Sequence, residues 1–153
     1  GTGPDGIVSQ LSRAKAEEVA ALCAPEDVIV AADTIVWAEG RVFGKPKSRD
    51  EAVAMLRALS GRSHTVYTGV TVLQGDGEET RVERTEVWFR PLSDAEIQAY
   101  ADTGEPMDKA GAYGAQGRAA LFVRGINGDF FNVMGLPLCT LGQMLNKQGV
   151  KLL

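Results

Sequence analysis

The stretch that decides the fold is Val28-Ile29-Val30-Ala31-Ala32-Asp33-Thr34-Ile35-Val36-Trp37. Its continuous run of apolar and β-branched residues predicts a strand that is covered on both faces. Asp33 interrupts this run. Burying a carboxylate is costly unless it is hydrogen-bonded, paired with a cation or bound to a metal. We therefore interpret Asp33 either as a functional carboxylate or as a turn or cap at the end of the strand.

Helix and strand patterns alternate on both sides of this stretch. Apolar spacing predicts a helix before Pro25, whose buried face carries Val8, Leu11, Lys15, Val19 and Leu22. The patterns further predict a helix over 52–59 and a hairpin of strands 64–73 and 80–89, whose second strand is exposed or lies at an edge. They also predict a helix that begins at the capping box Ser93–Glu96, and short strands over 119–123 and 150–153. His64, at the start of a strand, is interpreted as a hydrogen-bonded structural histidine. With no internal repeat or linker, residues 1–153 are expected to form a single α/β domain.

Charge and hydropathy exclude several classes of partner. Sixteen Lys and Arg stand against 20 Asp and Glu, which gives a net charge of −4 without a basic stripe. A nucleic-acid polymer is therefore not an expected partner. No apolar run approaches the roughly 20 residues that span a bilayer, and no secretory signal opens the sequence. We expect a cytoplasmic protein that does not bind membranes.

Four polar clusters carry the chemistry: Lys15; Asp33 with Thr34; Gly44 with Lys45; and Asp108-Lys109 with Gln116, in the glycine-rich stretch 105–117. Lysine ammonium groups and bare glycine backbone can bind phosphate. A carboxylate can hold Mg²⁺ or Mn²⁺, or take a proton from an attacking water. Together these groups favour hydrolysis of a phosphoanhydride, and the alternative is a set of solvated surface lysines. The phosphate motifs of P-loop and Rossmann proteins are absent from the sequence.

Five blocks of sequence, in order along the chain, resemble the Maf family of nucleotide pyrophosphatases. The blocks are Ala31-Ala32-Asp33-Thr34-Ile35-Val36, Gly44-Lys45-Pro46, the stretch from Leu59 to Gly69 (LSGRSHTVYTG), the stretch from Gly104 to Gly117 (GEPMDKAGAYGAQG) and the stretch from Gly128 to Pro137 (GDFFNVMGLP).

The resemblance implies a fold and an activity. Maf proteins have an α/β fold like that of inosine triphosphate pyrophosphatases, with a mixed twisted sheet flanked by helices and a cleft between two lobes, and they are often homodimers. They hydrolyse nucleoside triphosphates to the monophosphate and pyrophosphate with a divalent metal, Mg²⁺ or Mn²⁺. A threonine and a glutamine at the two specificity positions resemble the branch that acts on dTTP and UTP.

The resemblance also assigns roles to the residues that match the family's motifs. Asp33 is expected to accept the proton of the attacking water and to bind the metal. Lys15, Lys45 and Lys109 are expected to contact the phosphates. Thr34 and Gln116 are expected to set the specificity for the base.

One departure from the family leaves two further hypotheses open. Maf proteins begin with a strand and a Ser-x-Ser-Pro-Arg-Arg loop that contacts the substrate, and both are absent from this sequence, which begins Gly1-Thr2-Gly3-Pro4. The chain could therefore be a nucleotide-binding module with impaired catalysis. Alternatively, it could act on purine triphosphates such as inosine triphosphate or 7-methyl-GTP.

Overall fold

The computed structural model describes residues 3–153, and its centre is a five-stranded sheet with the order β2-β1-β3-β4-β5. The strands are β1 (Ile29–Ala38), β2 (Arg41–Phe43), β3 (Ser63–Gln74), β4 (Gly77–Phe89) and β5 (Val123–Asn127). The helices are α1 (Pro4–Ala20), α2 (Arg49–Leu59), α3 (Asp94–Asp102), α4 (Phe130–Met134) and α5 (Leu138–Lys147), with short 3-10 helices η1 (Glu105–Asp108), η2 (Ala110–Ala112) and η3 (Arg118–Leu121).

The predicted α/β sheet flanked by helices is confirmed, but its expected mixture of strand directions is not found. Within residues 3–153 all four pairs of neighbouring strands are antiparallel. Turns of two residues, 39–40 and 75–76, reverse the chain between β1 and β2 and between β3 and β4. Such short connections can join only antiparallel strands.

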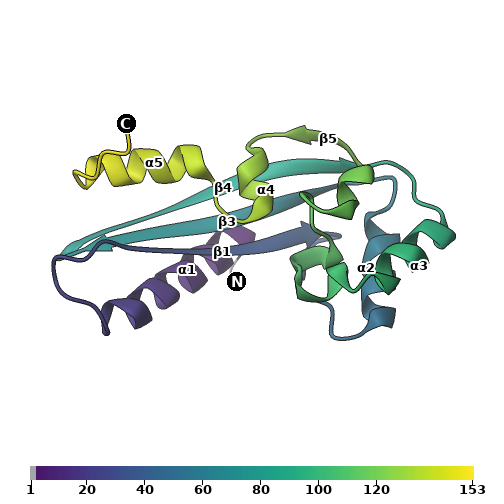
Figure 1. Cartoon of the computed structure of the whole chain (residues 1–153), viewed down its shortest axis with the longest axis horizontal. Coiled ribbons are helices and arrows are strands. Elements are labelled where there is room, and N and C mark those ends of the chain that lie inside the picture. Colours follow the sequence, from purple (N-terminus) through teal and green to yellow (C-terminus); the bar gives the residue numbers. More distant parts are fainter. Residues whose placement is uncertain (1–2) are drawn as a thin grey trace.

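Helices cover both faces of the long strands at one end of the molecule (Figure 1). On one face, Val8 of α1 packs against Ile35 and Tyr67. On the other face, α5 packs its apolar side chains on Val70 and Val72 of β3. Neighbouring residues of β3 point to opposite faces, so one strand supplies both contacts. The largest core lies at the other end of the sheet, where α2, α3 and the 3-10 helices gather.

The buried face of α1 differs from the predicted one. Val8, Ser12 and Ala16 are buried, whereas Leu11, Val19 and Leu22 are exposed. The cause is a close approach of the helix to β3 at Gly69, where an added Cβ would lie 2.3 Å from the Val8 carbonyl oxygen. A helix that lies this close to a sheet needs small residues on its inner face.

Strand β1 is less covered than its apolar sequence predicts. Residues 31–34 are half-buried and Val30 is exposed, whereas Ile35 and Val36 are buried. The reason is that β2 pairs only with residues 36–38 of β1. Among the described residues, the stretch 29–35 has a strand partner on one side only, so Asp33 lies on an open edge. Strand β4, predicted as exposed or at an edge, has this character over 77–85 and pairs with β5 over 86–89.

The predictions of short strands over 119–123 and 150–153 are wrong. Residues 118–121 form η3, because Ala119 and Phe122 are buried together at helical spacing. The strand follows it as β5. Residues 150–153 form no strand; the Val150 amide instead bonds to the Leu145 carbonyl at the end of α5, and Leu152 and Leu153 are exposed. None of the described helices is both long and apolar enough to cross a membrane.

Candidate active site

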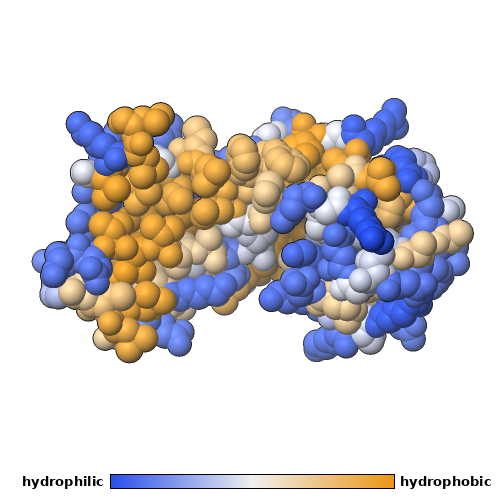
Figure 2. Space-filling view, viewed as in Figure 1, coloured by the Kyte–Doolittle hydropathy of each residue, from blue (hydrophilic) through white to orange (hydrophobic). Residues whose placement is uncertain are grey.

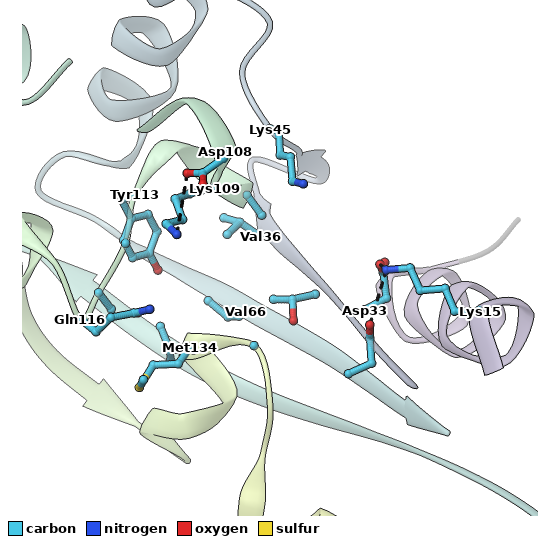
Figure 3. Close-up of a pocket in the computed structure, with 17 residues that line it drawn as sticks. Lys15, Asp33, Val36, Lys45, Val66, Asp108, Lys109, Tyr113, Gln116 and Met134 are labelled. Atoms are coloured by element: carbon cyan, nitrogen blue, oxygen red, sulfur yellow. Dashed lines mark hydrogen bonds and ion pairs between the residues drawn. The ribbon is translucent and has the colours of Figure 1, made fainter. Parts of the chain in front are cut away.

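A pocket of about 330 Å³ lies where the two ends of the molecule meet, and it is large enough for a small organic ligand (Figure 3). All six residues that the sequence singled out line it: Lys15, Asp33, Thr34, Lys45, Lys109 and Gln116. They come from α1, β1, the chain after β2 and the loop 105–117. The fold therefore brings together side chains that lie up to a hundred positions apart in the sequence.

Asp33 and Thr34 reach this pocket from opposite faces of the sheet. Asp33 is in contact with Lys15 of α1, on the α1 face. Thr34 lies opposite Thr68 on β3 and hydrogen-bonds to it, on the face that carries α4. Consecutive residues of a strand alternate in this way. The pocket can include both side chains because the edge of β1 is open at this point.

Lys15 and Asp33 form an ion pair on the α1 side of the pocket (Figure 3). The side chain of Lys15 is 54% exposed and that of Asp33 is 18% exposed. Water screens such a partly exposed pair, so the pair adds little to stability. A negatively charged phosphate could therefore draw the lysine away from the carboxylate at small cost.

The loop 105–117 brings Lys109 and Gln116 to the pocket through tight backbone contacts. The Gly111 amide donates to the carbonyl of Gly44, next to Lys45, at 3.0 Å. Gly111 has φ +70° and lies against Val36, where an added Cβ would be 2.7 Å from a valine methyl carbon. This contact therefore fixes the two lysine-bearing segments against the same strand.

Glu105 holds the far end of this loop. Its Oε1 accepts a hydrogen bond from the Arg118 amide at 3.2 Å, and Gly117 lies so close that an added Cβ would be 1.9 Å from that oxygen. The Tyr100 hydroxyl accepts a bond from the Gly114 amide at 3.0 Å. Burial raises the pKa of Tyr100, and the nearby Glu105 carboxylate adds to this shift. Gln116 is thus part of a loop that is braced on both sides.

Tyr113 lines the pocket, and His64 contacts it from the core side. His64 Nε2 and the Tyr113 hydroxyl are 2.6 Å apart, and both rings pack edge-on against Phe89. Burial lowers the pKa of His64 from 6.5 to about 4, so the ring is neutral at pH 7. This geometry agrees with the prediction that His64 is a hydrogen-bonded structural residue.

Comparison with known proteins assigns the chain to a family. The sequence matches the profile of the family described as Maf, Maf-like protein, over residues 2–148. The chain belongs to the Maf family. It is 53% identical over 148 residues to a protein of Carboxydothermus hydrogenoformans named dTTP/UTP pyrophosphatase, covering 95% of this chain and 79% of the relative.

Further relatives carry the same name. A Geobacillus protein, strain WCH70, is 53% identical over 135 residues, covering 88% of this chain and 72% of its own length. One from Pelotomaculum thermopropionicum is 47% identical over 155 residues, covering 100% of this chain and 81% of the relative. Each is named dTTP/UTP pyrophosphatase.

The acidic residues of this Maf pocket suit a metal ion that is bound jointly by protein carboxylates and substrate phosphates. Within residues 3–153, no three His, Cys, Asp or Glu side chains gather into a cluster that could hold an ion alone. Asp33 and Asp108 line the pocket on different sides, and Asp108 lies 3.7 Å from Lys109 (Figure 3). Mg²⁺ often binds through one or two carboxylates plus substrate phosphates and water. Asp33 can serve as such a carboxylate.

Sequence patterns did not reveal three residues that support the site: Glu105, Thr68 and Asn132. Thr68 and Asn132 are fully buried, and Asn132 Nδ2 bonds to the Val66 carbonyl at 3.2 Å and to Thr85 Oγ1 at 3.0 Å. All three lie inside the blocks that resemble the Maf family. Their roles depend on partners that are distant in sequence, so spacing alone carried no signal for them. The sequence is expected to depart from the Maf family at its N-terminus, and residues 1 and 2 of that stretch lie outside the described residues.

Proposed function

We propose that this chain hydrolyses dTTP and UTP to the nucleoside monophosphate and pyrophosphate. The observation that carries the proposal is one pocket lined by two carboxylates, three lysines and two polar side chains suited to a base. The names of the relatives, which match nearly the whole chain, support the same substrates. Because such nucleotides are substrates of the cell interior, we place the activity in the cytoplasm.

Asp33 would act as the general base in this reaction. Its carboxylate accepts a proton from the water that attacks the α-phosphorus, the bond from that phosphorus to the bridging oxygen breaks, and pyrophosphate leaves. Lys15, Lys45 and Lys109 would bind the phosphate oxygens as point charges and stabilise the charge that develops on them. A divalent ion bound with Asp33 and the phosphates would supply further neutralisation of that charge.

Pyrophosphate release from a panel of triphosphates tests the proposal. With Mg²⁺ or Mn²⁺ present, we expect turnover of dTTP and UTP above that of inosine triphosphate and 7-methyl-GTP. Asp33→Asn should lower kcat by about 100-fold or more, because it removes the proton acceptor. Asp102→Asn is the matched control, since Asp102 pairs with Arg49 on the surface away from the pocket and should leave kcat unchanged.

Two results would contradict the proposal. Binding of dTTP without any turnover would favour the nucleotide-binding module. Preferred turnover of a purine triphosphate would favour the purine enzyme.

A further inference from the structure

Lys109 reaches the pocket across the bare backbone of Gly114. A Cβ added at Gly114 would lie 3.3 Å from Lys109 Cε and 3.8 Å from its Cδ, so the stem of the lysine rests on this glycine. The ammonium group points into the pocket (Figure 3), and the exposed carboxylate of Asp108 lies 3.7 Å from it. An exposed pair at this distance fixes a lysine only weakly. The position of Gly114 therefore decides where the stem of Lys109 lies.

Open space next to this loop gives Lys109 other places to go. A neighbouring pocket of about 440 Å³ is lined by Lys109, Gly114 and Glu105 as well. The lysine side chain is 37% exposed and has a flexible stem, so several conformations are open to it. A lysine that moves among them must be ordered when it binds a phosphate, and this ordering weakens binding. Whatever holds Gly114 in place therefore affects the affinity of the pocket for phosphate.

Tyr100 of α3 fixes the position of Gly114. Its hydroxyl accepts a hydrogen bond from the Gly114 amide at 3.0 Å. Tyr100 is buried, and its ring packs edge-on against Phe122 with 5.1 Å between the ring centroids. Gly114 lies between η2 and η3, outside the helices and strands of residues 3–153, so its amide depends on this side chain for an acceptor.

Glu105 holds the Tyr100 hydroxyl in turn. An amide can only donate, so the Tyr100 oxygen accepts from Gly114 and its own proton is free for another acceptor. Burial, and then hydrogen bonding to the Glu105 carboxylate, raise the pKa of Tyr100. Oε2 of Glu105 is buried, and no other group of residues 3–153 pairs with it, so the hydroxyl proton points to this carboxylate. The Arg118 amide anchors Oε1 of Glu105 separately, at 3.2 Å.

We propose that Tyr100 and Glu105 are positioning residues that hold Lys109 in the pocket, in place to bind a phosphate group of the substrate. This inference rests on the proposed function, in which Lys109 contacts phosphate. Neither Tyr100 nor Glu105 lines the pocket, so each acts on the ligand only through the loop that carries the lysine. An ammonium group that is already in place binds phosphate without a further loss of side-chain freedom.

The first test compares kcat/KM for dTTP in two variants. Tyr100→Phe keeps the ring and its packing but removes the hydroxyl, so the Gly114 amide loses its acceptor. We expect kcat/KM to fall about fivefold to tenfold, the size of ordering one flexible side chain on binding. Glu105→Gln keeps the size of the side chain but replaces one acceptor oxygen by a donor, and it should lower kcat/KM by a similar factor. An unchanged kcat/KM in Tyr100→Phe overturns the inference and leaves the proposed function intact.

Thr71→Val is the control for lost stability. Thr71 is buried on β3, bonds to Ser12 Oγ at 2.9 Å and to Thr80 Oγ1 at 2.8 Å, and does not line the pocket. This variant should lower the melting temperature to a similar extent and leave kcat/KM unchanged. If Thr71→Val lowers kcat/KM as much as Tyr100→Phe does, the effect is one of general stability and the inference is overturned.

A double-mutant cycle shows whether Tyr100 acts through Lys109. Lys109→Met keeps the length of the stem but removes the charge, so kcat/KM should fall by more than in Tyr100→Phe. Adding Tyr100→Phe to it should lower kcat/KM no further, because no ammonium group remains to be positioned. An equal effect of Tyr100→Phe with and without the lysine would show that Tyr100 acts by another route, which overturns the inference.

A binding measurement separates the inference from catalysis. Calorimetry with inorganic pyrophosphate and Mg²⁺ should show an affinity that is about fivefold to tenfold lower in Tyr100→Phe and unchanged in Thr71→Val. If the wild-type chain binds pyrophosphate but does not turn over dTTP, the proposed function fails, and these affinities still decide whether Tyr100 positions the lysine. Equal affinities of the wild type and Tyr100→Phe, or no binding by either, would contradict it.

Discussion

At the scale of single residues, burial decides the charge state of the one histidine. His64 lies against Phe89 and Tyr113, and its Nδ1 is buried without a hydrogen-bond partner among the described residues. A protonated ring would lose its hydration and gain no acceptor there, which is why the pKa of His64 falls to about 4. The neutral ring can pack in the core and still bond to the Tyr113 hydroxyl.

This shift makes stability depend on pH in a defined window. Between pH 6.5 and about 4 the unfolded chain binds one more proton at His64 than the folded chain, so the free energy of unfolding falls as the pH falls. The total loss should reach about 3 kcal/mol below pH 4. Urea unfolding between pH 4 and 7 measures most of this loss, with His64→Gln as the variant that cannot titrate. Equal slopes in the two proteins would show that the histidine does not contribute.

At the scale of elements, glycine contacts hold the loop 105–117 against the sheet. Gly111 has positive φ and touches Val36 of β1, so alanine there is strained and overpacked. Gly111→Ala should lower the free energy of unfolding by about 2 kcal/mol and raise KM, because Val36 and Lys109 line the pocket.

Gly142→Ala is the matched control for this substitution. Gly142 lies within α5, and nothing lies within 4 Å of an added Cβ. Alanine favours a helix over glycine, so this change should raise the free energy of unfolding by about 0.5–1 kcal/mol. Urea unfolding of both variants should give changes of opposite sign. A neutral Gly111→Ala would mean that the loop relaxes away from β1.

At the scale of the whole molecule, apolar surface gathers over the half that carries α1 and α5 (Figure 2). An exposed apolar stripe, which comprises Leu11 and Val19 of α1 and Leu22 just after its end, contributes apolar side chains to this half. Contiguous exposed apolar patches on a protein mark interaction surfaces. The homodimer that the family resemblance implies remains a prediction, and this stripe is a suitable surface for it.

Sedimentation equilibrium tests that prediction. We expect a weight-average mass that rises with concentration toward twice that of the chain. The double variant Val19→Lys and Leu22→Lys should remain monomeric, because a lysine buried in an interface would lose its hydration. Leu121→Lys, at an exposed leucine on η3, should not change association. A wild-type chain that stays monomeric at every concentration would argue against a homodimer.

The sequence by itself determined the chemistry of this protein and most of its elements. Local signals were enough for α2, the β3–β4 hairpin and the capping box of α3, because neighbouring residues carry them. The sequence motifs also identified six of the side chains that line the pocket. Only the tertiary structure decided where these side chains stand relative to one another. It left the edge of β1 open at Asp33 and Thr34, because β2 pairs only with residues 36–38, so both side chains reach one pocket from opposite faces of the sheet.

The buried face of α1 and the position of the loop 105–117 also depended on tertiary structure. The first is set by Gly69 on β3, and the second by the contact of Gly111 with Val36 and its hydrogen bond to the Gly44 carbonyl. Spacing along the chain reports which face of a helix or strand is apolar, because that property is local. It does not report close approach, because this depends on atoms of residues far apart in the sequence.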